Sequence, residues 1–305
     1  MRRIFLVAEF LFALGLLSPA ADVSSCGGSF AASSEDVNAV NRFIRAVRAL
    51  NESPDHIARL AELIRFPLRR EYPLPGIHSP FEFLARYKEV FDERLVRRVM
   101  EWDGGCVNTF KYGLHLRDVV RFDKDGMVWR IDYESEVEKH ERSRLIELHR
   151  NELHDSLQEY ESPILDWETC TYRIRIDYVG DDTFRYASWK VGTAYGSKPD
   201  LIIDDGELFY EGTGLFRYYY FANGKYRYVI DGASAGMYRR PQPGFLRVYR
   251  ADLSDEDMSR YGYRSLGSLW FDEQSDAPRE PLLVEEIVSG DPGYWYVRTS
   301  ACGGE

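Results

Sequence analysis

The sequence predicts an α+β fold, with a helix-rich α+β domain over residues 35–160 and a mainly antiparallel β domain over residues 161–305. Three observations predict this division. Apolar residues recur at helical spacing in the first half. From residue 167 onward, β-branched and aromatic residues alternate with polar ones, and turn residues separate the alternating runs. The length of 305 residues, with 44% hydrophobic and 29% charged residues, suits a globular chain of two domains.

Three helices are expected before residue 100. The first has apolar residues at helical spacing, namely Val37, Val40, Phe43, Ile44, Val47 and Leu50. Ser53-Pro54 begins the second, because proline is tolerated at the first helical position. The third begins at Ser79-Pro80-Phe81-Glu82, a capping box, and its apolar side continues to Val99.

The rest of the first half is expected to form strands and one long helix. Residues 106–122 and 127–133 have the composition of strands around the turn Asp123–Gly126. Residues 134–161 form a densely charged segment with few apolar residues, which is typical of a surface or connecting helix.

The second half contains several turn signals between its predicted strands. They include Gly180-Asp181-Asp182, Asp204-Asp205-Gly206 and Asn223-Gly224. The pair Asn223-Gly224 lies between two aromatic runs and predicts a hairpin with a type I′ turn. An antiparallel sheet of several short strands is therefore expected.

Four segments resemble exported bacterial proteins with an NTF2-like (SnoaL-type) domain. They are Phe66-Pro67-Leu68, Ser79–Leu84, Tyr87–Phe91 and the strand residues Gly126–Ile131. The stretch from Lys198 to Tyr226 is similar to a second β module of such proteins. The resemblance implies an α+β cone and export. It implies no activity, because the NTF2-like class includes both enzymes and pure binding modules.

The first 20 residues have the three parts of a secretory signal peptide. Two arginines precede the apolar run Ile4–Leu17, and Ser18-Pro19-Ala20 places small residues at a cleavage site. The apolar run is too short to span a bilayer. Residues 21–34 are expected to be a flexible linker, and the mature protein is expected to be periplasmic or secreted. The excess of Arg over Lys, 32 to 7, indicates a GC-rich bacterial genome.

A lipid anchor is the alternative to a soluble mature protein. Val23-Ser24-Ser25-Cys26 resembles a bacterial lipobox, in which Cys26 would be lipidated after cleavage. The glycines and serines that follow would then form a tether.

Four cysteines, Cys26, Cys106, Cys170 and Cys302, are candidates for disulfides in an oxidising compartment. Four cysteines allow three connectivities. The similar ends Cys26-Gly27-Gly28 and Cys302-Gly303-Gly304 favour a bridge between Cys26 and Cys302, which would leave Cys106 with Cys170. Lipidation of Cys26 would instead leave one cysteine unpaired.

No motif for catalysis, a metal or a cofactor fits its required context. Gly232–Gly236 matches the nucleophile elbow G-x-S-x-G, but Pro241 and Pro243 prevent the helix that must follow. No histidine lies downstream of Ser234. The sequence therefore predicts no catalytic residue, metal or cofactor. The net charge of −11 argues against nucleic-acid binding.

Two features predict a binding surface. Aromatic residues on both faces of one hairpin would suit a protein or sugar surface, and acidic residues nearby would attract a basic partner. The candidate residues are Tyr218, Tyr220, Tyr226, Tyr228, Asp204 and Asp205.

The resulting hypothesis is an exported, non-catalytic binding protein of the bacterial periplasm or envelope. Its partner would be a protein, such as a basic toxin or cell-wall hydrolase that it inhibits as an immunity protein does. The alternatives are a carboxylate-dependent glycan hydrolase and a carbohydrate-binding envelope module.

Overall fold

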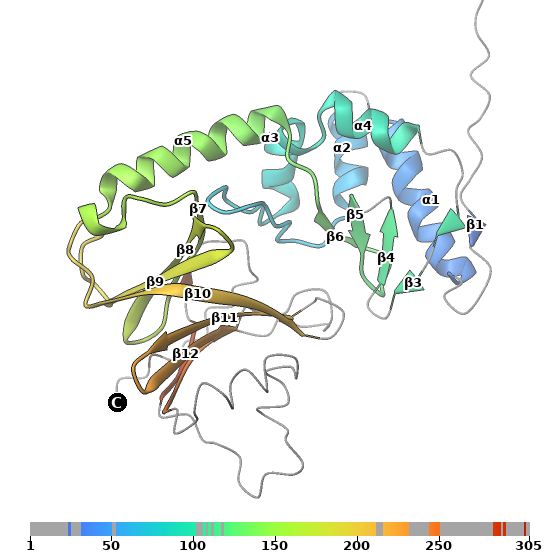
Figure 1. The fold of residues 1–305 in the computed structure, drawn as a ribbon. Coiled ribbons are helices and arrows are strands. Elements are labelled where there is room, and N and C mark those ends of the chain that lie inside the picture. The colour runs from blue at the N-terminus through green and yellow to red at the C-terminus, as the bar shows by residue number, and fades with distance from the viewer. Residues whose placement is uncertain are drawn as a thin grey trace, which may run out of the picture.

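A computed structural model describes most of the chain between residues 32 and 231 and parts of the remainder. The described residues are 24–25, 32–50, 53–101, 106–107, 109–110, 113–116, 119–211, 216–231, 244–250, 283–287, 289–290 and 302. The predicted signal peptide, the lipidation candidate Cys26 and the motif around Ser234 lie outside these residues. The described residues confirm an α+β fold (Figure 1).

In the part of the chain that the structure describes, the α-helices all lie in the first half. Within the described residues they are α1 (Ser34–Arg48), α2 (Pro54–Ala61), α3 (Pro80–Val90), α4 (Glu93–Met100) and α5 (Glu136–Glu152). The apolar face of α1 is buried because Val40, Phe43, Ile44 and Val47 recur at helical spacing. These side chains form one core with residues of α2, α3, α4 and the small sheet.

The third predicted helix is in fact two helices. The apolar pattern runs from Phe83 to Val99, but the backbone leaves the helical conformation at Phe91. Asp92 then begins α4, because its side chain accepts a hydrogen bond from the Leu95 amide at 2.8 Å. The prediction of one helix was wrong because the non-helical backbone at Phe91 and the N-cap at Asp92 divide the apolar pattern into two helices.

Two small sheets accompany these helices. One is antiparallel and contains β3 (Thr109–Phe110), β4 (Gly113–Leu116), β5 (Val120–Phe122) and β6 (Val128–Ile131). The other is a parallel pair, β1 (Ser24–Ser25) with β2 (Cys106–Val107). Val120, Phe122, Val128 and Ile131 are buried and belong to the same core as α1.

The charged helix α5 is shorter than the predicted residues 134–161. It begins after Ser135, whose capping box with Glu138 supplies both of its reciprocal hydrogen bonds. It ends before Leu153, and a short 3₁₀ helix (Asp155–Leu157) follows. The chain turns here because Leu153, Leu157 and Tyr160 are buried against the large sheet.

The second half forms one large antiparallel sheet that closes on itself. Its successive strands are β7 (Ser162–Glu168), β8 (Tyr172–Gly180), β9 (Thr183–Lys190), β10 (Leu201–Glu211), β11 (Phe216–Asn223), β12 (Tyr226–Asp231), β13 (Phe245–Arg250), β14 (Leu283–Glu286) and β15 (Ser289–Gly290). The last two strands belong to one short segment. Because β14 pairs with β13 and β15 pairs with β7, this segment joins the two edges of the sheet.

The interior of the closed sheet is an apolar core of alternate strand residues. They include Trp167, Ile176, Tyr186, Phe221 and Ile230. Gly206 is required here, because a Cβ atom at this position would lie 2.0 Å from the Phe221 ring. The other face of β8 and β9 is covered by the end of α5 and the residues that follow it (Figure 1).

The turn signals of the second half had mixed outcomes. Asp181 and Asp182, with φ of 50° and 57°, form the two-residue turn between β8 and β9, as a type I′ turn requires. The β11–β12 hairpin is also present, but Gly224 and Lys225 are its turn residues and only Gly224 has a positive φ. The predicted type I′ turn at Asn223-Gly224 was therefore wrong. The predicted turn at Asp204–Gly206 is a bulge within the continuous strand β10.

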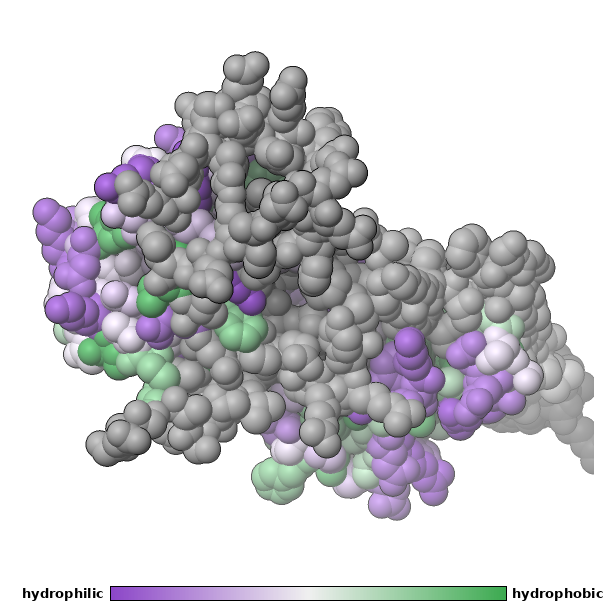
Figure 2. Space-filling model, turned by 90° about the horizontal axis from the view of Figure 1, so that it is seen from below, coloured by the Kyte–Doolittle hydropathy of each residue, from purple (hydrophilic) through white to green (hydrophobic). Residues whose placement is uncertain are grey.

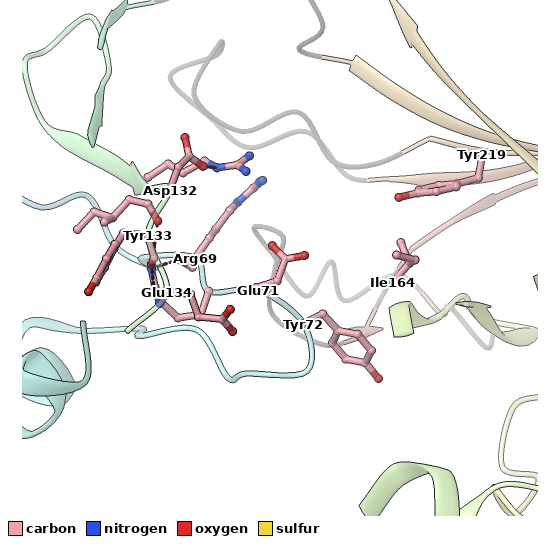
Figure 3. A pocket seen from close by; sticks show the side chains of 11 residues that line it. Arg69, Glu71, Tyr72, Asp132, Tyr133, Glu134, Ile164 and Tyr219 are labelled. Atoms are coloured by element: carbon pink, nitrogen blue, oxygen red, sulfur yellow. Dashed lines mark hydrogen bonds and ion pairs between the residues drawn. The ribbon is translucent and has the colours of Figure 1, made fainter. Parts of the chain in front are cut away.

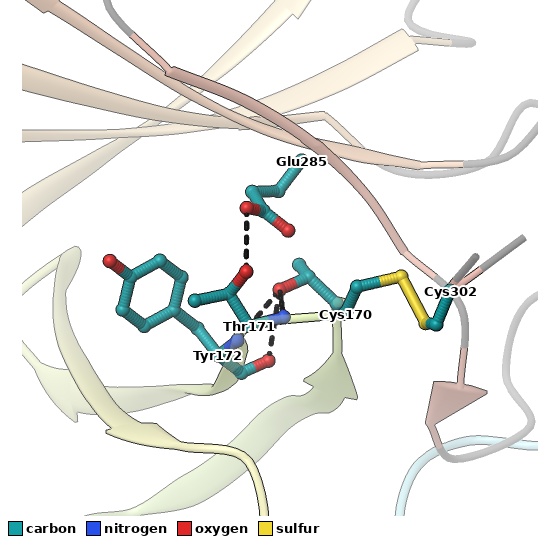
Figure 4. Close-up of a disulfide and its surroundings, with 6 residues drawn as sticks. Cys170, Thr171, Tyr172, Glu285 and Cys302 are labelled. Atoms are coloured by element: carbon teal, nitrogen blue, oxygen red, sulfur yellow. Dashed lines mark hydrogen bonds between the residues drawn. A yellow bond between two sulfur atoms is a disulfide. The ribbon is translucent and has the colours of Figure 1, made fainter. Parts of the chain in front are cut away.

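The structure pairs Cys170 with Cys302, so the expected bridges Cys26–Cys302 and Cys106–Cys170 are wrong (Figure 4). The reason is the closure of the sheet. The strand β15 pairs Ser289 with Glu168, which brings the end of the chain beside the β7–β8 turn that holds Cys170. Thr171 in this turn also donates a hydrogen bond to Glu285 at 2.9 Å.

The described surface seen from the large-sheet side mixes hydrophilic and hydrophobic residues rather than separating them (Figure 2). Among the described residues, no helix is long and apolar enough to cross a membrane.

Removal of the disulfide should destabilise the chain without abolishing its fold. The Cys170–Cys302 bridge spans 132 residues, so it restricts the unfolded chain strongly. We expect Cys170→Ser and Cys302→Ser each to lower the free energy of unfolding by about 2–4 kcal/mol, measured by urea denaturation. The double variant should match either single variant. A decrease in the free energy of unfolding in only one of the two single variants would contradict this pairing.

Candidate functional site

A cavity of about 360 Å³ lies between the two halves of the chain (Figure 3). Segments 69–72 and 130–134 line one side, and Ile164 of β7 and Tyr219 of β11 line the other. Both of the latter residues pack against the interior core of the closed sheet. The cavity therefore borders that interior, and neither half of the chain forms it alone.

Arg70 holds in place the wall of the cavity that segments 69–72 and 130–134 form, called here the first-half wall. It forms a two-point ion pair with Glu138 of α5, and both side chains are only 2% exposed. The same guanidinium donates to the carbonyl oxygens of Ile131 and Tyr133, at 3.2 and 2.6 Å. Planar arginine suits this arrangement because its donors fan out in one plane. Arg70 thus joins three segments of the chain.

Glu138 has a second role at the start of α5. Its carboxylate accepts a hydrogen bond from the Ser135 amide at 3.3 Å, while the Ser135 hydroxyl accepts one from the Glu138 amide at 3.1 Å. The Ser135 hydroxyl donates in turn to the carbonyl oxygen of Glu89 at 2.5 Å. The buried ion pair is therefore continuous with the cap of α5 and with the end of α3.

Arg130 and Asp132 form the next part of the wall. Asp132 accepts hydrogen bonds from the Nε atoms of both Arg121 and Arg130. Arg130 is about one third exposed, and among the described residues its only partner is Asp132, through Nε. Its two Nη groups are therefore available for a ligand in the cavity, while Arg121 continues to hold Asp132.

Glu134 is a cavity residue whose carboxylate is incompletely hydrogen-bonded. Its Oε1 atom is buried and has no hydrogen-bond partner among the described residues. Burial raises the pKa of Glu134, and the nearby carboxylates of Glu138 and Glu71 raise it further. Arg142 and Arg70 act in the opposite direction. A buried oxygen without a partner costs stability unless a bound group supplies a hydrogen bond.

Tyr133 and Arg142 hold the cavity segments in place. The Tyr133 hydroxyl donates to Asp92 at 2.7 Å, and burial together with this carboxylate raises the pKa of Tyr133 to about 12. The hydroxyl therefore stays protonated and anchors its segment to the start of α4. Arg142 of α5 donates to the Tyr72 carbonyl and to the Ser162 hydroxyl, both at 2.8 Å. It thus connects the first-half wall with the beginning of β7.

The four predicted tyrosines do not share one surface. Tyr226 and Tyr228 are partly buried and pack against the interior core of the closed sheet. Tyr218 and Tyr220 occupy the opposite face of the sheet, where Tyr218 is only 9% exposed and Tyr220 contacts the ring of Phe209. The intervening residue, Tyr219, belongs to the interior core and also lines the cavity.

Asp204 and Asp205 are exposed, as a surface that attracts a basic partner requires. They lie at the β10 bulge, and Asp205 has a positive φ of 58°. The structure does not bring them together with the cavity residues.

A second charged cluster lies between α5 and the large sheet, and its groups are already paired. Asp177 of β8 accepts from Arg175 at 3.0 Å and from Arg185 of β9 at 3.3 Å. Asp166 of β7 accepts hydrogen bonds from Nε and Nη2 of Arg173, at 2.9 and 2.8 Å. Arg185 also donates to the carbonyl oxygen of Leu157 at 2.8 Å, which attaches the residues after α5 to the sheet. We therefore assign the cluster a structural role.

No group of three or more potential metal ligands occurs in the part of the chain that the structure describes. Comparison with known proteins adds no further information on the site, since no protein-family model, curated protein or solved structure matches this chain.

None of the cavity residues is among the site residues predicted from the sequence. One signal was present, because Ser135-Glu136-Val137-Glu138 is a capping box that marks the start of α5. The partner of Glu138 could not be identified, because Arg70 lies 68 residues earlier and the sequence contains 32 arginines.

The Arg70–Glu138 pair should be costly to break from one side. Glu138→Gln leaves the buried Arg70 charge without its counter-ion, and we expect a loss of about 3–5 kcal/mol in urea denaturation. The double variant Arg70→Met/Glu138→Leu should recover much of this loss. The matched control is Glu141→Gln, which removes the exposed partner of Arg144 and should cost under about 1 kcal/mol. A similar small cost for Glu138→Gln would show that the pair does not hold the wall.

The raised pKa of Glu134 predicts a pH dependence of stability. The folded chain binds this proton more tightly than the unfolded chain, whose carboxyl has a pKa near 4.5. The favourable contribution is complete below pH 4.5 and is lost as the pH rises through the folded pKa. Glu134→Gln has no titrating carboxyl group at this position, so its stability does not fall in this way as the pH rises. The variant should therefore gain stability relative to the natural chain between pH 4 and pH 8.

Thermal unfolding across this pH range measures the effect, with Glu62→Gln at an exposed position after α2 as the matched control. A stability difference between Glu134→Gln and the natural chain that stays constant with pH would contradict the assignment.

Proposed function

We propose that the chain is an exported, non-catalytic binding protein of the bacterial periplasm or envelope, and that the junction cavity is its ligand site. The observation that carries the proposal is the polar lining of this cavity, in which the buried Oε1 of Glu134 has no protein partner among the described residues. The volume of about 360 Å³ lies near the lower end of the usual range for ligand pockets, about 300–1,000 Å³. A small polar ligand would fit it.

Two further observations support this proposal. The pKa of Glu134 is raised by burial, and perturbed titratable groups in a cavity are typical of functional sites. The Cys170–Cys302 disulfide is compatible with an oxidising compartment, as the signal-peptide features of residues 1–20 imply.

Thermal unfolding of the full oxidised chain with a panel of small ligands tests the proposal. The panel comprises neutral sugars, acidic sugars, free amino acids, dipeptides and inorganic phosphate. A ligand at 100 times its dissociation constant should stabilise the chain by about 2.7 kcal/mol. Ile164→Trp should abolish this gain by filling the cavity, whereas Val191→Trp, at an exposed position after β9, should retain it. Absence of stabilisation by every ligand class would overturn the proposal.

A glycan hydrolase is the second candidate, because Glu134 and Glu71 both line the cavity. A glycosidase needs two carboxyl groups, one of which keeps its proton near neutral pH. The raised pKa of Glu134 suits the general acid, and Glu71 would then be its partner. Release of reducing sugar from cell-wall glycan, lost in both Glu134→Gln and Glu71→Gln, would favour this candidate over pure binding.

The inhibitor hypothesis depends on Asp204 and Asp205 rather than on the cavity, and it stays a prediction. Its test is the replacement of both residues by lysine. An acidic inhibitor should then lose its salt-sensitive affinity for a basic hydrolase, and unchanged affinity would exclude these two residues.

A further inference from the structure

The cavity presents a positive and a negative group that keep polar atoms without a hydrogen-bond partner among the described residues. Arg130 and Glu134 follow each other closely on the chain, at the end of β6 and just before α5, and both line the cavity. Each offers hydrogen-bonding atoms without a partner among the described residues. These groups are the Nη donors of Arg130 and the Oε1 acceptor of Glu134.

The negative side of the cavity has two carboxyl groups. Glu71 lines the cavity together with Glu134, and their mutual repulsion contributes to the raised pKa of Glu134. Figure 3 shows both side chains on the wall that faces Ile164 and Tyr219 across the cavity. A ligand cation here would relieve the repulsion and favour the ionised form of Glu134. A neutral hydroxyl group would do this much less.

The positive side has a guanidinium whose orientation is fixed. The Nε atom of Arg130 is bound to Asp132, so its plane is held and its outer donors are directed by the protein. Arginine in this state matches a carboxylate or another planar anion in two-point geometry. The opposite wall supplies Ile164 and the Tyr219 ring, which suit an apolar or aromatic part of a ligand.

We propose that the cavity binds a zwitterionic ligand of the amino-acid or short-peptide class. Its ammonium group lies against Glu134 and Glu71, its carboxylate against Arg130, and its side chain against Ile164 and Tyr219. This inference rests on the proposed function and names the ligand class of the same cavity. Free amino acids and short peptides combine these charges in a molecule small enough for about 360 Å³.

Calorimetric titration of the full chain with free L-amino acids and dipeptides of all side-chain types tests the inference. The probe that binds best is then compared with its N-acetylated form, which lacks the ammonium group, and with its C-terminal amide, which lacks the carboxylate. Each modification should weaken binding by about tenfold or more, because each removes a charge-assisted hydrogen bond.

Two variants assign the two ends of the ligand. Glu134→Gln should weaken the free and amidated probes but leave the acetylated probe unchanged. Arg130→Met should weaken the free and acetylated probes but leave the amidated probe unchanged. Arg121 still holds Asp132 in this variant, so the wall should remain intact. The exposed substitutions Glu62→Gln and Arg144→Met serve as controls.

The outcomes separate the inference from the proposed function. Equal binding of free and capped probes would overturn the zwitterion inference. So would binding of a neutral sugar or inorganic phosphate in place of any amino acid or dipeptide. In both cases, if Ile164→Trp also abolished binding of the ligand found, the proposed function would stand, because the ligand would still occupy the cavity. Failure of every amino acid, dipeptide, sugar and anion to bind would overturn both.

Discussion

The buried ion pair between Arg70 and Glu138 is the interaction on which the first-half wall of the cavity depends. It connects the segment before α3, the end of β6 and the first turn of α5 through one guanidinium. A buried pair of this kind adds little net stability over an apolar pair, but it is costly to leave half complete. Its effect is therefore to specify one arrangement of these three segments, and this arrangement places Arg130 and Glu134 in the same wall.

The closure of the large sheet supplies the other wall. The segment that contains β14 and β15 pairs with both edges of the sheet, and the disulfide holds the end of the chain at the β7–β8 turn. Closure fixes Ile164 and Tyr219 on strands that are not neighbours in the sheet. Arg142 then connects α5 with the start of β7, so the two walls face each other. The cavity is thus a product of tertiary contacts.

The sequence predicted the fold class because local periodicity differs between the two halves. Helical spacing in α1 and alternation in β8 depend on neighbouring residues only. The helix α1 buries its apolar face, and Ile174 and Ile176 of β8 lie in the interior core. Errors arose where a single residue decides the outcome. Asp92 divides one apolar pattern into α3 and α4, and the bulge at Asp204 and Asp205 keeps β10 continuous.

The site could not be predicted for a different physical reason. The sequence predicts aromatic rings on both faces of the hairpin, and strand alternation places Tyr226 and Tyr228 inside the sheet and Tyr218 outside. Tyr219 points to the interior core by the same alternation, and it also lines the cavity between the two halves. The pairing of Arg70 with Glu138 depends on contacts across 68 residues, which composition and spacing do not specify.

We infer that both halves of the chain together form one ligand site. Backbone amide spectra of the deuterated, isotope-labelled chain during a titration with the best-binding dipeptide test it most directly. We expect the amides of residues 69–72 and 130–134 to shift together with those of Ile164 and Tyr219, with a single dissociation constant. Shifts confined to one half, or two different constants, would contradict it.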